Sequence, residues 1–137
     1  MSILDQFETN EKKEIEGVEI SFPPNDDGSI PVFIIAATSR TNQKYSAALE
    51  KAVRPYKGNI KELGNARAEV LYRAVFVETV LKGWKNVQDR DGKEIPYSKE
   101  EALKLFQRAP RLYDRLNAEA ADIENFKDAV REEQAGN

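Results

Sequence analysis

The chain has 137 residues, of which 40% are hydrophobic and 33% are charged, and its formal net charge is −3. This length fits one domain that is large enough to bury a core. The sequence contains no cysteine and no histidine. That composition excludes disulfides and thiolate metal sites, and it removes the usual general base near neutral pH. We therefore expect a protein of a reducing cytosol that is not an enzyme and needs no cofactor.

The N-terminal stretch predicts neither export nor membrane insertion. It has no basic region followed by an apolar one, and the longest apolar run, residues 32–37, is far too short to span a bilayer. Residues 1–14 are polar, with Ile3, Leu4 and Phe7 as the large apolar side chains, so we expect a flexible segment without regular structure. A single α+β domain is expected over residues 15–133, with a frayed tail at 134–137.

Two strands are predicted after that segment. Val18, Ile20 and Phe22 alternate with polar residues, which is typical of a strand with one buried face. Turn-forming residues follow at 23–29, and the apolar run at 30–37 predicts a more buried partner strand. Because two strands alone are marginally stable, this N-terminal β-hairpin must pack on helices, and its outer edges are candidate contact edges.

Helical signals dominate the rest of the chain. Asn42 can cap a helix from residue 43 to the region of Pro55. Apolar residues from 60 to Trp84 follow at helical spacing, which predicts a long central helix with a capping-box-like start at residues 59–62. Gly64 within it indicates either a later start or a close backbone contact.

Two more helices are predicted downstream. Ser98 and Glu101 form an S-x-x-E capping box, so a helix should begin there. Pro110 is suited to be the first residue of the next helix, whose apolar stripe runs from Leu112 to Val130. The predicted fold is α+β and predominantly α-helical, with the N-terminal β-hairpin packed on about four helices.

No motif in the sequence strongly predicts a metal-binding or catalytic site. The turn from Asp89 to Gly92 resembles part of a calcium loop, but the first and twelfth ligand positions would be Val87 and Ser98, so a polar β-turn is the better interpretation. A metal-dependent enzyme using Asp89 and Asp91 is the remaining enzymatic hypothesis. The other carboxylates alternate with Lys and Arg as on solvated helix faces, and no glycine-rich phosphate loop is present.

Charge is distributed unevenly. Residues 1–30 contain eight acidic and two basic side chains, whereas residues 31–76 contain eight basic and three acidic ones. We favour an internal match between the acidic start and the basic helices. The alternative is a small nucleic-acid-binding or regulatory protein that uses the basic region, in particular the side chains of Arg40, Lys44, Lys51, Arg54, Lys57 and Lys61.

A pattern of elements in the C-terminal part resembles a known family. It consists of Gly83-Trp84, the turn at 89–92, Ile-Pro-Tyr-Ser at 95–98, Phe106, Pro-Arg-Leu-Tyr at 110–113 and Asn125-Phe126. Their order and spacing over residues 60–137 are similar to those of the tail assembly chaperones of long-tailed, siphovirus-type bacteriophages and prophages.

The resemblance implies a non-enzymatic protein of the host cytoplasm that binds the tape measure protein, helps to recruit tail tube subunits and is absent from the finished virion. Some members are also made as a longer, frameshifted product. Neither a membrane nor a nucleic acid is implied as partner, and an uncovered hairpin edge allows self-association. From the exposed hairpin and the aromatic positions we predict partner contacts at Val18, Ile20, Phe22, Val32, Ile34, Trp84, Tyr97 and Tyr113.

Overall fold

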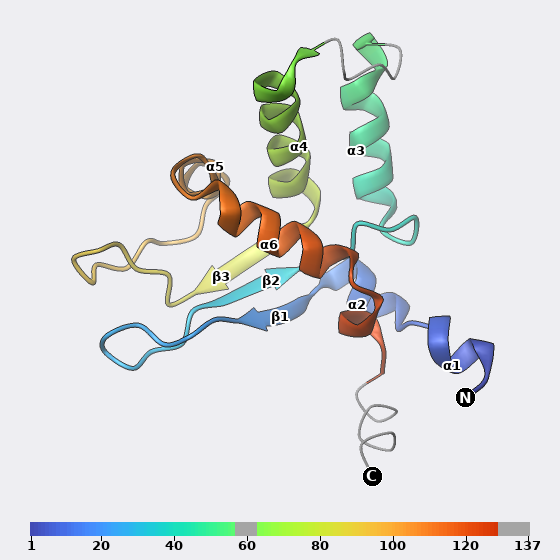
Figure 1. Ribbon diagram of the computed structural model, residues 1–137, viewed down its shortest axis with the longest axis horizontal. Helices are drawn as coiled ribbons and strands as arrows, with labels where there is room; N and C mark the ends of the chain where they lie inside the picture. Colours follow the sequence, from blue (N-terminus) through green and yellow to red (C-terminus); the bar gives the residue numbers. More distant parts are fainter. Residues whose placement is uncertain (57–62, 129–137) are drawn as a thin grey trace.

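The computed structural model describes residues 1–56 and 63–128, and over these residues the fold is α+β and mostly helical, as predicted (Figure 1). An antiparallel sheet in the order β1-β2-β3 lies below two helices, and a helical hairpin projects away from it. The strands are β1 (Val18–Ser21), β2 (Val32–Ile35) and β3 (Leu81–Lys85). The helices are α1 (Ile3–Phe7), α2 (Glu11–Glu16), α3 (Gln43–Val53), α4 (Asn65–Thr79), α5 (Lys99–Arg108) and α6 (Pro110–Ala121), with short 3-10 helices η1 (Arg54–Tyr56) and η3 (Ile123–Phe126).

The predicted hairpin of β1 and β2 is confirmed. The two strands pair antiparallel, with Val18 opposite Ile35 and Ser21 opposite Val32. The alternation in β1 turns Ile20 into the core and leaves Glu19 and Ser21 exposed.

The third strand corrects the sequence analysis. We predicted one helix up to Trp84, but α4 ends at Thr79 and the chain enters β3 at Leu81. In β3, Gly83 lies opposite Ile34 and Trp84 opposite Phe33. Pairing with β2 satisfies backbone groups of this segment and buries Leu81 and Trp84, so tertiary contacts override the helical spacing.

The starts of the two hairpin helices depend on different residues. Gly64 is the N-cap of α4, with φ +78°, so of the two alternatives at this glycine the later helix start is the one found. The capping-box-like residues 59–62 lie outside the described residues. Asn42 caps α3 as predicted. Its side chain is buried, and its Nδ2 donates to the carbonyl oxygens of Ala37 at 2.9 Å and Thr79 at 3.2 Å. Asn42 thus joins the base of α3 to the end of α4.

The N-terminal segment differs from the expectation of no regular structure before residue 15. Ser2 and Asp5 form a capping box for α1, and Asn10 caps α2. Glu14 of α2 is buried and accepts hydrogen bonds from Thr9 Oγ1 at 2.8 Å and Ser39 Oγ at 2.9 Å. Short capped helices of this kind escaped prediction because they lack a long apolar stripe.

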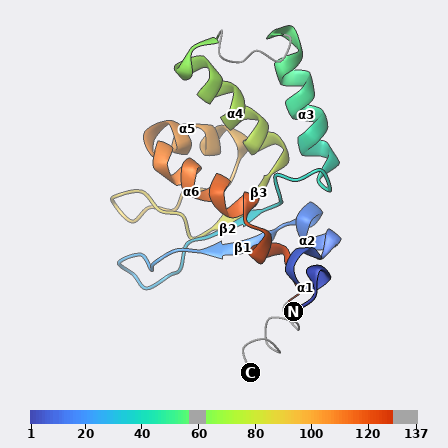
Figure 2. The same cartoon turned by 45° about the vertical axis from the view of Figure 1, so that its right-hand side comes forward.

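The core lies between the sheet and the helices α4, α5 and α6, which Figure 2 shows stacked above the strands. Phe76 of α4, Phe106 of α5 and Tyr113 of α6 form three edge-to-face ring contacts, with centroids 5.2 to 5.9 Å apart. The helix starts at Ser98 and Pro110 are confirmed, and Ser98 Oγ accepts from the Glu101 amide at 3.0 Å.

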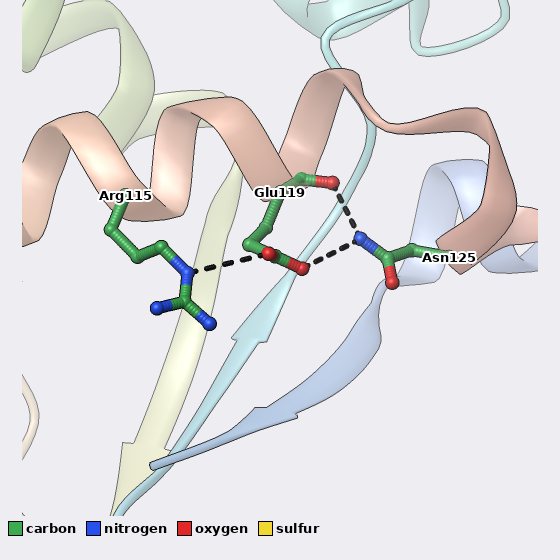
Figure 3. Close-up of polar contacts among 3 residues, drawn as sticks. All are labelled: Arg115, Glu119 and Asn125. Atoms are coloured by element: carbon green, nitrogen blue, oxygen red, sulfur yellow. Dashed lines mark hydrogen bonds and ion pairs between the residues drawn. The ribbon is translucent and has the colours of Figure 1, made fainter.

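The end of α6 is fixed by a small polar cluster (Figure 3). Asn125 Nδ2 donates to the backbone oxygen of Glu119 and to its Oε2, both at 2.9 Å, and Arg115 Nε donates to Glu119 Oε1 at 3.3 Å. The Asn125-Phe126 element therefore has a structural role: Asn125 closes the helix, and Phe126 is buried beneath it.

Candidate partner-binding surface

Two of the eight residues predicted to contact a partner are buried in the core. Ile20 is 8% exposed and Trp84 is 7% exposed. The Trp84 indole donates to the carbonyl oxygen of Ile95 at 2.7 Å, and its ring makes edge contacts with Phe33 and Tyr97. In this fold neither side chain is presented to a partner, and Trp84 instead ties the chain after β3 to the sheet.

Four other predicted residues are half-buried against the core. These are Val18, Phe22, Tyr97 and Tyr113. The Tyr97 hydroxyl donates to the Leu81 carbonyl at 3.2 Å, and the Arg115 guanidinium carbon lies 5.5 Å from the Phe22 ring centroid. Their contacts hold loops and helices to the sheet, and only their outer edges are accessible.

Val32 and Ile34 are half-buried and alternate with the buried Phe33 and Ile35, so they lie on the opposite face of the sheet. Near them, Lys85 Nζ of β3 is 3.8 Å from Glu19 Oε1 of β1. This face therefore combines a small apolar centre with a surface ion pair.

The turn at residues 89–92 is confirmed as a β-turn. Asp89 Oδ1 accepts from the amides of Asp91 at 2.9 Å and Lys93 at 3.0 Å, and Gly92 has φ +79°. Within the described ranges, 1–56 and 63–128, no group of three or more acidic side chains is placed to hold a metal ion.

The loops at 22–31 and 86–98 bind each other through their side chains. Asn25 Nδ2 donates to the Asn86 carbonyl at 2.8 Å, and Gln88 Nε2 donates to Asp27 Oδ2 at 2.9 Å. Hydrogen bonds from the Ser29 hydroxyl and amide, together with Gln88, lower the pKa of Asp27 to about 2. These hydrogen bonds hold the two loops together, which gives their polar residues a structural role.

An apolar feature that the sequence analysis missed is a groove on the projecting hairpin. We call it the hairpin groove; it measures about 520 Å³ and is lined by Tyr56, Leu63, Ala66, Arg67, Val70, Leu71 and Ala74. Val70 is 64% exposed and Tyr56 is 36% exposed, although both are large apolar side chains. Arg67 supplies the charge of the lining. Figure 1 shows that this part of α4 lies far from the sheet.

A second, smaller cavity lies where the hairpin meets α6. It measures about 340 Å³, and Tyr45, Tyr72 and Tyr113 contribute to its lining. Burial raises the pKa of Tyr113 to about 12 and also raises that of Tyr45, so these phenols stay neutral near neutral pH. Glu69 and Asn117 also line the cavity, so it offers aromatic, hydroxyl, carboxylate and amide contacts to a ligand.

Within the described residues, two ion pairs of the basic helices are local and do not reach the acidic start. Arg54 pairs with Glu50 and Arg73 with Glu69, each within its own helix. Glu19 of the acidic stretch pairs with Lys85, which lies outside the basic region.

Comparison with protein families gives the class of this protein, which is a prophage protein. The model of the family described as "YdaY prophage protein" matches residues 40–137, which is more than half of the chain. The chain therefore belongs to the YdaY prophage protein family. The matched region includes the α3–α4 hairpin with its groove and all of α5 and α6.

Two further comparisons found no match, neither a curated protein nor a solved structure. The expectation of a phage or prophage origin is thus confirmed, at the level of the family. Over the described residues, no helix has the length and apolar character needed to cross a membrane.

Proposed function

We propose that this protein is a tail assembly chaperone whose hairpin groove binds an apolar helical segment of the tape measure protein of the same prophage. In this role it acts in the host cytoplasm without catalysis, helps to recruit tail tube subunits and leaves before the virion is finished. The observation that carries the proposal is the exposed apolar surface of α4, on a chain of prophage origin.

The groove suits this kind of partner. Its lining comes from successive turns of α4 together with Tyr56 and Leu63, so it offers an elongated apolar strip. Amphipathic helices bind such grooves by placing apolar residues at three- and four-residue steps. Exposed apolar side chains that cluster in a surface groove are a feature of interaction sites. A long helical tail protein would expose complementary surface before assembly, and covering it would prevent aggregation.

The proposal predicts that Val70→Asp weakens binding. The carboxylate would enter the groove, where an apolar partner offers it no hydrogen bond, and we expect at least a tenfold higher Kd, equivalent to about 1.4 kcal/mol or more. Binding of the purified chain to the tape measure protein would be measured by calorimetry or pull-down. The soluble yield of the tape measure protein on co-expression should fall in parallel.

Leu103→Asp provides the matched control, because Leu103 is also an exposed apolar residue of a helix but lies on α5, outside the groove. It should leave binding unchanged, and both variants should melt like the wild type. Equal binding by wild type and Val70→Asp would contradict the role of the groove. Failure of the wild-type chain to bind or solubilise the tape measure protein would contradict the chaperone function.

A second candidate function follows from the exposed basic side chains of Arg40, Lys44, Lys51 and Arg54. If these residues bind a nucleic acid, the affinity must fall steeply with salt, because phosphate contacts release counterions. Fluorescence anisotropy with DNA and RNA oligonucleotides across a salt series tests this. We expect no salt-dependent binding, and a salt-dependent affinity that disappears in Lys51→Ala/Arg54→Ala would favour the second candidate.

A further inference from the structure

We propose that the hairpin groove of one copy of this chain binds helix α1 of a second copy, so that the free protein associates head to tail. This inference needs no phage partner and stands apart from the proposed function. It starts from two exposed apolar surfaces that are found on the same molecule.

The first surface is helix α1. Ile3, Leu4 and Phe7 are 65%, 64% and 63% exposed, and the helix has no buried residue. Their spacing places the three side chains on one face of the helix. The capping box of Ser2 and Asp5 holds this turn in helical form before any contact is made. A preformed apolar face at the end of the chain is suited to insertion into a groove.

The second surface is the hairpin groove, and its charge complements that of the N-terminal segment. Residues 1–11 contain three acidic side chains and no Lys or Arg. The described residues of the hairpin, 43–56 and 63–79, contain five basic and three acidic side chains, with Arg67 in the groove lining itself. Acidic groups beside α1 would therefore meet Arg67 and the net positive hairpin while the apolar side chains enter the groove.

The arrangement of the two surfaces requires a second copy. Both views show α1 at the end of the molecule opposite the C-terminal end of α3 and the N-terminal end of α4 (Figures 1 and 2). One chain cannot place its own α1 in its own groove while the fold is kept. Because two different surfaces meet, the contact is heterologous, and its repetition gives a ring or an open chain of copies.

Analytical ultracentrifugation of the purified full-length chain tests the inference. We expect the weight-average mass of the wild type to rise with concentration. The double variant Leu4→Ser/Phe7→Ser removes the α1 surface, and Val70→Asp blocks the groove. Each should raise the dissociation constant at least about tenfold and leave a monomer at concentrations where the wild type associates.

A mixture of the two variants gives the sharpest result. The α1 variant retains an intact groove and the groove variant retains an intact α1, so an equimolar mixture should form a heterodimer that grows no further. Leu103→Ser serves as a control that should associate like the wild type. Circular dichroism and melting curves should be the same for all the variants.

Three outcomes would overturn the inference. The first is a wild type that stays monomeric over the whole concentration range. The second is self-association of the groove variant that only the α1 substitutions abolish, which would indicate contact between two α1 helices. The third is a mixture of variants that remains monomeric. Each outcome is measured on the purified chain without a partner, so it contradicts self-association and not binding to the tape measure protein.

Discussion

Replacing Trp84 with alanine is expected to lower the free energy of unfolding by about 3 to 5 kcal/mol, because it removes a large aromatic side chain from the core. The indole also donates at 2.7 Å to the Ile95 carbonyl, which would lose its partner. The measurement is urea unfolding followed by circular dichroism, since Trp84 is the single tryptophan and cannot report on its own loss.

Trp84→Phe provides the matched control. Phenylalanine preserves an aromatic ring beside Phe33 and Tyr97 but removes the hydrogen bond, so its cost should be smaller, about 1 to 3 kcal/mol. This experiment separates two roles for the residue. If Trp84→Ala kept wild-type stability and lost only partner binding, Trp84 would be a surface anchor, as the sequence analysis predicted, and its place in the core would be contradicted.

Gly17→Ala is expected to be the other strongly destabilising change, by at least about 2 kcal/mol. Gly17 ends helix α2 with φ +106° and ψ 165°, a conformation that is essentially restricted to glycine. A Cβ at this position would lie 3.0 Å from the backbone oxygen of Ile35, which the sheet holds in place. Thermal melting of the purified variant measures the effect.

Gly83→Ala is the matched control for this backbone effect. Gly83 also lies in contact with β2, opposite Ile34, but it has no positive φ, and an added Cβ would meet no atom within 4 Å. We expect a change within about 0.5 kcal/mol. Equal stability of Gly17→Ala and the wild type would show that the chain relaxes at the junction of α2 and β1, contrary to the prediction.

The sequence predicted those elements whose signals are local. The alternation around Ile20, the cap at Asn42 and the starts at Ser98 and Pro110 each depend on a few neighbouring residues, and all are present. The strand β3 could not be predicted in this way. Leu81 and Trp84 fit a helical stripe as well as a strand, and their conformation depends on β2, which is distant in the sequence.

For the predicted contact residues, the structure adds the burial of each side chain, which the sequence does not reveal. An apolar side chain such as Trp84 has the same appearance in the sequence whether it is buried or exposed, and here two of the eight predicted residues are buried in the core while six are half-buried. The sequence does contain a signal for the hairpin groove. Helix α4 carries apolar residues around much of its circumference, including Val70, Leu71 and Tyr72, which is more than one buried face requires.

The α3–α4 hairpin is an insertion between two neighbouring strands: it lies between β2 and β3 in the sequence, and these two strands pair directly with each other. Lengthening such an insertion costs little loop-closure entropy, about 0.6 kcal/mol for each doubling of its length. The core cluster uses Phe76, Val77 and Val80 at the end of this hairpin, and no residue from the first turns of α4. Evolution could therefore change the length of the α3–α4 hairpin and the residues of its groove, and with them the choice of partner, while the sheet and the helices α5 and α6 stay the same.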